Sequence, residues 1–149
     1  MTSPEGSSVT FRRPPATLRQ RIITNFARVL ERDVAKGRGF DTLITGDAEL
    51  RRLNANFRNK DYATDVLSFP SGEDGAFLGD IAISLGRARA QAREFGHPIE
   101  HEVQILMLHG VLHLMGYDHE SDTGAMARTE RRWRGKLGLP NGLIERVRA

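Results

Sequence analysis

Three of the five histidines lie within eleven residues, in the segment HGVLHLMGYDH from 109 to 119. His109 and His113 are four residues apart, one turn of an α-helix, so both imidazoles leave the same face and can bind one metal ion. On a continuing helix, His119 would lie about 9 Å further along the axis and roughly 120° around from that face. Gly116 resolves this, because glycine tolerates the positive φ that reverses the chain. The segment therefore predicts a metal site held by His109, His113 and His119.

Three neutral imidazoles leave one coordination position open, which is typical of catalytic rather than structural zinc. Zinc is the usual metal for imidazole ligands, although nickel or copper can replace it in vitro. We therefore expect one Zn²⁺ per chain. The alternative is three unrelated histidines in or near a core. In that case two imidazoles on an apolar helix would need other polar partners.

The same spacing occurs in the zinc signature of metzincin peptidases. In those enzymes a glutamate follows the first histidine and acts as the general base. Here that position is Gly110. Because a peptidase mechanism would lack its proton acceptor, the sequence disfavours a protease.

The elements that must position these histidines follow from apolar periodicity. The helix between Pro98 and Gly116 is apolar nearly all round, so it should run through the core. Further helices are expected after Thr17, which forms a capping box with Gln20, and after Asp47, Leu85 and Asp122. Strands are expected at residues 9–12, 40–45, 65–69 and 77–84, the last two forming a hairpin. The sum is one α+β domain over residues 1–149, a small mixed β-sheet covered by helices, with a buried central helix carrying a zincin-like site. Residues 1–16 are expected to be poorly ordered.

Composition narrows the class of protein. The chain of 149 residues has no cysteine, which excludes disulfides, thiolate metal sites and cysteine nucleophiles. It shows no secretory signal and no apolar run long enough to span a membrane, so we expect a cytoplasmic protein.

Charge is unevenly distributed along the chain. Residues 1–60 hold 12 Lys and Arg against 6 Asp and Glu, residues 61–122 hold 3 against 11, and residues 123–149 hold 7 against 2. Two basic flanks around an acidic middle favour a polyanion-binding surface beside a cation site. Solvated helix faces would give the same distribution. The same two interpretations apply to the basic cluster from Arg128 to Lys136.

HGVLHLMGYDH resembles the signature of the YbeY family, zinc-dependent endoribonucleases that mature bacterial ribosomal RNA. Further segments agree in order: residues 53–54 (LN), 57–58 (FR), 64–70 (TDVLSFP) and 78–84 (LGDIAIS). The resemblance extends from about residue 40 to 138. Ala63 departs from it, because the family usually has proline there.

The resemblance implies an α+β fold, zinc on the three histidines, and cleavage of single-stranded RNA in 16S rRNA 3′-end maturation and ribosome quality control. It also implies a functional arginine at Arg58, which would grip a phosphate near the metal. From the residues alone, Arg58 could equally be a surface arginine at a helix end. The partners expected are ribosomal RNA and the small ribosomal subunit, with ribosomal or assembly-factor proteins also compatible.

Four carboxylates could orient a ligand imidazole or hold a proton, although each could instead serve only a structural role: Asp65, Asp80, Glu102 and Asp118. Two other functions stay open. One is a ribosome-assembly factor that binds RNA and has a structural zinc. The other is a metallohydrolase acting on a peptide or a small substrate.

Overall fold

The computed structural model describes residues 6–58, 64–72, 75–117 and 124–139. Within these ranges one four-stranded sheet is formed by β1 (Ser8–Phe11), β2 (Gly39–Thr45), β3 (Val66–Pro70) and β4 (Phe77–Ser84). The strand order is β1-β2-β4-β3. β1 pairs parallel with β2 and β2 pairs parallel with β4, whereas β3 and β4 form the expected antiparallel pair. The predicted small mixed sheet is confirmed.

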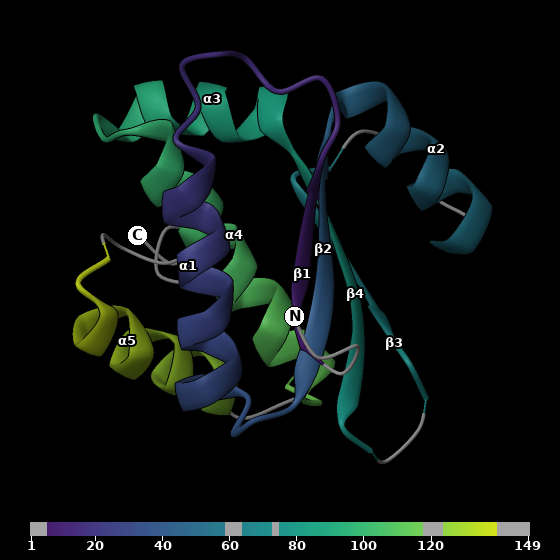
Figure 1. Ribbon diagram of the computed structural model, residues 1–149, viewed down its shortest axis with the longest axis vertical. Coiled ribbons are helices and arrows are strands. Elements are labelled where there is room, and N and C mark those ends of the chain that lie inside the picture. The colour runs from purple at the N-terminus through teal and green to yellow at the C-terminus, as the bar shows by residue number, and fades with distance from the viewer. Residues whose placement is uncertain (1–5, 59–63, 73–74, 118–123, 140–149) are drawn as a thin grey trace.

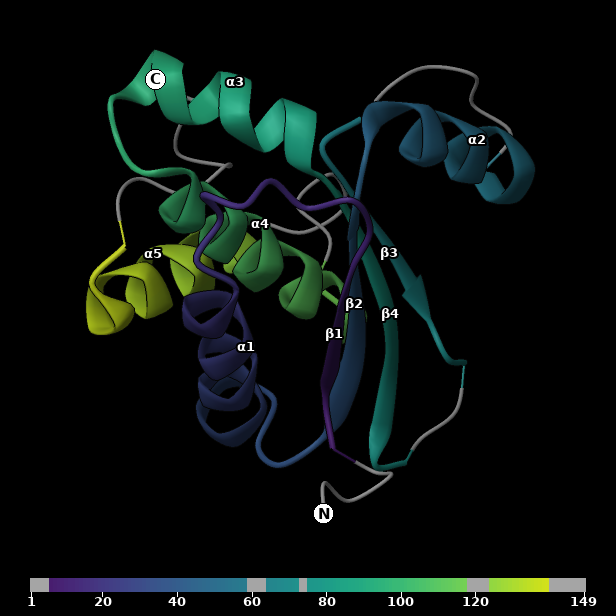
Figure 2. The ribbon, with the colours of Figure 1, turned by 45° about the horizontal axis from the view of Figure 1, so that its top comes forward.

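Five α-helices surround this sheet in the described ranges: α1 (Gln20–Val29), α2 (Asp47–Arg58), α3 (Leu85–Phe95), α4 (Ile99–Leu114) and α5 (Ala125–Leu137). A π-helical segment, η1 (Leu30–Val34), extends α1. Helices α1, α4 and α5 lie on one side of the sheet and α2 lies on the other (Figure 1; Figure 2). The α+β class is therefore confirmed.

The alternation of side chains along the strands gives the sheet two different faces. Ile81 of β4 faces α4 so closely that a Cβ on Gly110 would lie 3.0 Å from it. On the opposite face, Leu50 of α2 packs with Leu67 and Ala82. Helices α2 and α4 are thus separated by the thickness of the sheet.

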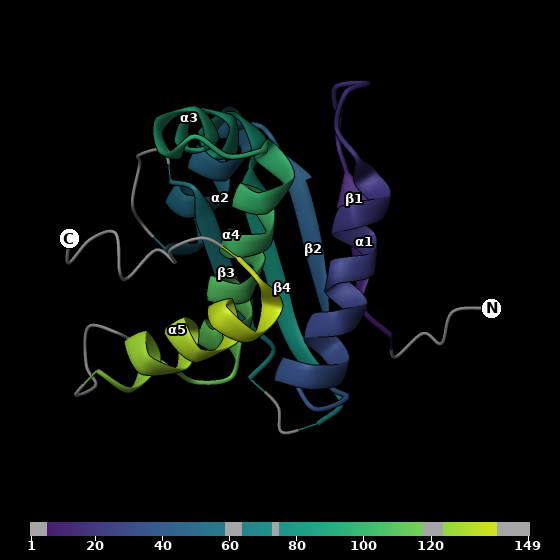
Figure 3. The same ribbon diagram turned by 90° about the vertical axis from the view of Figure 1, so that its left-hand side faces the viewer.

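Helix α4 is buried on nearly every side, as its apolar sequence predicts. Pro98 is its N-cap residue and Met115 its C-cap residue. Gly116 follows with φ of 102°, which confirms the predicted glycine turn. Helix α5 lies across the C-terminal part of α4 (Figure 3). None of the helices in the described ranges is long and apolar enough to cross a membrane.

The N-terminal region agrees with its prediction in one respect and differs in another. The strand expected at residues 9–12 is present as β1, and after it the Arg12 N–H donates to the Ile44 carbonyl at 2.9 Å. The predicted capping box is wrong, since α1 begins only at Gln20 and no side-chain cap is formed by its N-cap residue, Arg19. Instead the backbone N–H of Arg19 donates to the Glu100 carboxylate of α4 at 2.9 Å. A partner 81 residues away replaces the local cap.

Candidate metal centre

Helix α4 brings two of the predicted ligands together. The Nε2 atoms of His109 and His113 lie 3.1 Å apart, and the two rings meet edge to face with centroids 4.7 Å apart. His109 is buried with 7% of its surface exposed, whereas His113 is half-buried. We call these two residues the histidine pair. Their one-turn spacing has the effect predicted from the sequence, with both imidazoles on one face of the helix.

A buried carboxylate of α5 holds the other nitrogen of His109. Glu130 Oε2 lies 2.7 Å from His109 Nδ1, and Glu130 is 1% exposed. Because a carboxylate accepts, this contact places the ring proton on Nδ1 and leaves the Nε2 lone pair directed at His113. Sequence reasoning missed Glu130. Its signal was a carboxylate four residues after Met126 and three before Trp133, on the face expected to be apolar.

The arrangement of these nitrogens fits a shared metal ion. Two ligands about 2.05 Å from one tetrahedral ion lie about 3.3 Å apart, close to the 3.1 Å observed. Neutral imidazole nitrogens are the donors that zinc prefers. His119, the third predicted ligand, lies outside the described residues. Within them no group of three or more His, Cys, Asp or Glu side chains is placed to hold a metal ion. The third ligand and the open position stay predictions.

Three of the four carboxylates proposed from sequence can be placed, and two of these bind other partners. Glu102 Oε2 lies 2.6 Å from His97 Nε2, at the opposite end of α4 from the histidine pair. Asp65 accepts a hydrogen bond from Gln91 Nε2 at 3.1 Å. Neither residue contacts the histidine pair through these bonds. Asp118 lies outside the described residues.

Asp80 lies on the wrong face of the sheet to orient a ligand imidazole. Its neighbour Ile81 faces α4, so Asp80 points to the opposite face, beside Asp41 on β2. Partial burial, and then the negative charge of Asp41, raise the pKa of Asp80.

Arg58 is the last residue of α2, on the side of the sheet opposite α4. Its side chain lies outside what the structure describes. In the basic cluster of α5, Arg131, Arg132 and Lys136 are exposed, and the Lys136 ammonium lies 5.1 Å from the centre of the Trp133 ring. The outer face of α5 is therefore basic. This agrees both with a surface that binds a polyanion and with a solvated helix face.

Comparison with known proteins places the chain in a family. The family model described as endoribonuclease YbeY matches residues 11–138. A curated endoribonuclease YbeY of Solibacter usitatus is 74% identical over 149 residues, which cover 100% of both chains. Another, of Nautilia profundicola, is 50% identical over 71% of this chain and 77% of its own. The solution structure of the protein TM1509 from Thermotoga maritima matches with a TM-score of 0.58 and 27% identity, over 87% of this chain and 91% of that one. This chain belongs to the YbeY family.

Proposed function

We propose that this protein is a zinc-dependent endoribonuclease of the cytoplasm that cuts single-stranded RNA in 16S rRNA 3′-end maturation and ribosome quality control. Its family is named for endoribonuclease activity, which gives an RNA substrate. The observation that carries the proposal is the histidine pair, with Nε2 atoms 3.1 Å apart and Glu130 bonded to the far nitrogen of His109. Burying polar groups in a core is costly unless they have partners, and a shared metal ion would supply one for the two Nε2 atoms that face each other.

The residues proposed to hold the zinc ion are His109, His113 and His119. When bound, such an ion supplies Lewis-acid polarisation of a phosphoryl oxygen. Glu130 keeps the proton of His109 on Nδ1, fixes the orientation of the ring and raises the basicity of Nε2. Its own burial keeps water from competing for that proton. His113 is more exposed than His109, so the pair has a buried side and a side open to substrate.

Arg58 is proposed to bind a phosphate of the RNA. A guanidinium presents two parallel N–H groups to two phosphate oxygens, which both fixes the phosphate and offsets charge that develops during cleavage. Lysine carries the same charge without this fork.

Cleavage by purified variants tests the proposal. Wild-type protein, His113→Ala and Arg58→Ala, purified identically, would be incubated with single-stranded RNA spanning the 3′ end of 16S rRNA. His113→Ala should lose both metal and cleavage, which also controls for contaminating nucleases. Arg58→Ala should keep its metal and melting temperature yet cleave about 10–150-fold more slowly, the equivalent of a lost charge-assisted hydrogen bond of about 1.5–3 kcal/mol. Arg58→Lys should cleave as slowly as Arg58→Ala if the arginine binds the phosphate through two parallel hydrogen bonds.

The same variants can be tested in cells. In a strain that lacks the chromosomal copy, wild type should restore mature 16S 3′ ends and His113→Ala should not. A His113→Ala copy that restores the ends without binding metal would contradict the enzyme and favour an RNA-binding assembly factor.

A further inference from the structure

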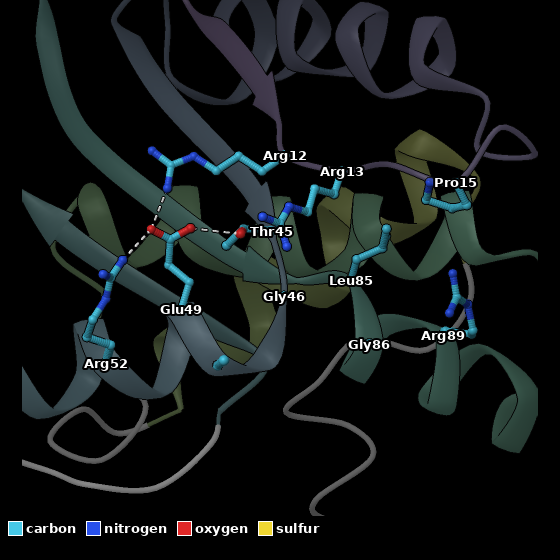
Figure 4. Close-up of a pocket in the computed structure, with 11 residues that line it drawn as sticks. Arg12, Arg13, Pro15, Thr45, Gly46, Glu49, Arg52, Leu85, Gly86 and Arg89 are labelled. Carbon is cyan, nitrogen blue, oxygen red and sulfur yellow. Dashed lines mark hydrogen bonds and ion pairs between the residues drawn. The ribbon is translucent and has the colours of Figure 1, made fainter.

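A pocket of about 690 Å³ lies at the carboxyl ends of β2 and β4 (Figure 4). It is remote from the histidine pair, since Leu114, next to His113, packs near Gly79 at the other end of β4. Among the residues that the structure describes, four arginines and one glutamate give the pocket its charge. The described residues that line it are Arg12, Arg13, Pro15, Thr45, Gly46, Ala48, Glu49, Arg52, Leu85, Gly86 and Arg89. We call it the arginine pocket.

One end of the arginine pocket is a fixed ion cluster. Glu49 accepts hydrogen bonds from Arg12 at 2.5 Å and Arg52 at 2.7 Å, and from the Thr45 hydroxyl at 2.8 Å. The Thr45 bond, and after it the two arginines, lower the pKa of Glu49 and keep it ionised. Two cations on one carboxylate leave this end of the pocket with a surplus positive charge.

Arg13 and Arg89 make no hydrogen bond or ion pair within the described part of the chain. Both are exposed, and in Figure 4 Arg89 lies at the end of the pocket away from Glu49, with Arg13 between. Two guanidiniums in one pocket without carboxylate partners repel each other, so an anion placed between them is stabilised by both.

The backbone around the pocket also favours binding of an anion. Helices α2 and α3 both begin here, and Gly46, Ala48, Leu85 and Gly86 from their first turns or the residues before them are part of the lining. Helix N-termini carry partial positive charge and amide N–H groups for an anion. Part of this is already used here, because Asp47 and Glu49 lie in the first turn of α2 and the Ser84 side chain caps α3. The arginines are therefore the main source of positive charge in the pocket. The carboxyl edge of parallel strands is also where sheets flanked by helices bind ligands.

We propose that the arginine pocket binds the phosphodiester backbone of single-stranded RNA, at a distance from the bond that is cut. None of its described lining residues is aromatic, so these residues offer no surface on which a base can stack, and their contacts would go to phosphates without regard to sequence. This inference rests on the proposed function for its RNA substrate. It adds a second point at which the strand is held.

The test uses the two arginines without partners, because changing Arg12 or Arg52 would also disturb Glu49. The matched control is Arg28→Gln with Lys36→Gln. Arg28 is an exposed helical arginine like Arg89, and Lys36 has a left-handed backbone with φ of 55°, like the 50° of Arg13. Both control residues belong to the end of the molecule where β2 begins, away from the pocket.

Binding of a 2′-O-methylated single-stranded 12-mer would be followed by fluorescence anisotropy across a salt series. Arg13→Gln with Arg89→Gln should bind about tenfold or more weakly. Its log–log salt slope should also become shallower by about 1.4, or roughly 0.7 for each lost phosphate contact. The control pair should stay within about twofold of wild type. In cleavage of unmodified RNA, the pocket variant should raise KM and leave kcat unchanged.

The outcomes separate this inference from the proposed function. If wild type cuts RNA but the pocket variant binds like the control pair, the pocket inference is wrong and the nuclease stands. If the pocket variant weakens binding while wild type leaves unmodified RNA uncut, the nuclease is wrong and the pocket stands. Adenosine monophosphate and inorganic phosphate serve as competitors. Displacement of the 12-mer by either one at equal phosphate concentration would overturn binding of a strand in favour of a free-anion site.

Discussion

Two buried glutamate–histidine contacts lie at opposite ends of α4. Glu102 is fully buried against His97, and Glu130 is 1% exposed against His109. Only the second faces an imidazole whose other nitrogen points at a further imidazole. The two contacts therefore have similar chemistry and burial but different surroundings. That makes Glu102 a matched control for the role of Glu130.

We expect Glu130→Gln to lower metal affinity about 10–100-fold while the protein stays folded. An amide oxygen can still accept the Nδ1 proton of His109, but without the negative charge that raises the basicity of Nε2. Competition with a chromophoric chelator measures the affinity. Glu102→Gln should leave it unchanged, since its imidazole belongs to His97. Equal losses in both variants would show a general effect of removing a buried charge.

The raised pKa of Asp80 leads to a prediction about how the stability of the protein depends on pH. Because its folded-state pKa is raised, ionisation of Asp80 costs more free energy in the folded protein than in the unfolded chain. The penalty is absent below the unfolded pKa of about 3.9, grows as pH rises towards the folded pKa and is complete at neutral pH. Asp80→Asn should therefore stabilise the protein at pH 7, by less than about 1 kcal/mol since solvent screens so exposed a group. Urea unfolding at pH 7 and at pH 3.5 measures this, and the gain should vanish at the lower pH.

The histidine pair and Glu130 show what a sequence can predict at a site. The one-turn spacing of His109 and His113 determines their common face, because helix geometry is local. The Glu130 contact depends on how α5 crosses α4, which no local pattern describes. Asp80 could have been placed, since strand alternation puts it opposite the buried Ile81.

At the scale of elements, Gly110 determines how closely α4 approaches the sheet. A Cβ there would lie 3.0 Å from two atoms of Ile81, and the Gly110 carbonyl also accepts a hydrogen bond from Ser68 of β3 at 3.1 Å. The residue next to His109 thus faces the sheet rather than the histidine pair. The position held by a glutamate in metzincins is here a packing position.

We expect Gly110→Ala to destabilise the protein by about 1–3 kcal/mol, because the added methyl group forces α4 away from β4 or moves Ile81 off its rotamer. Gly135→Ala in α5 is the control, since in the described part of the chain no atom beyond the adjoining residues and the backbone of its own helix lies within 4 Å of the place its added methyl group would take. That change should stabilise by about 0.5–1 kcal/mol through helix propensity. Thermal unfolding of both variants measures the difference. A Gly110→Ala protein as stable as wild type would show that the contact with Ile81 relaxes without cost.

Most elements could be predicted because their signals are local. The turn-rich segment between residues 70 and 77 predicted the β3–β4 hairpin. The period of 3.6 predicted α3, and the long apolar run between Pro98 and Gly116 predicted α4. The parallel pairing of β1 with β2 has no such signal, since it joins strands separated by a helix. The prediction of how α1 begins was wrong for the same reason, because the carboxylate that binds the Arg19 N–H belongs to Glu100, a residue distant in sequence.

At the scale of the whole molecule, the proposed metal would add a link between α4 and the segment that follows its glycine turn, in a region where Glu130 already connects α4 to α5. His109 and His113 belong to α4, Glu130 connects them to α5, and His119 follows the glycine turn after α4. Binding an ion to the folded form alone stabilises by mass action, about 2.7 kcal/mol at 100 times the dissociation constant. The stability of the fold and the integrity of the site are then linked.

We therefore expect Zn²⁺ at that excess to raise the melting temperature of chelator-treated protein by roughly 5–10 °C, given about 2–4 °C per kcal/mol for a chain of this length. His113→Ala should show no rise, because two remaining imidazoles hold the ion too weakly. His101→Ala changes a half-buried histidine of the same helix outside the pair and should keep the full rise. Differential scanning calorimetry with and without metal measures all three. If His113→Ala shows the full rise as well, the ion binds elsewhere, and the histidine pair is part of the core rather than a metal site.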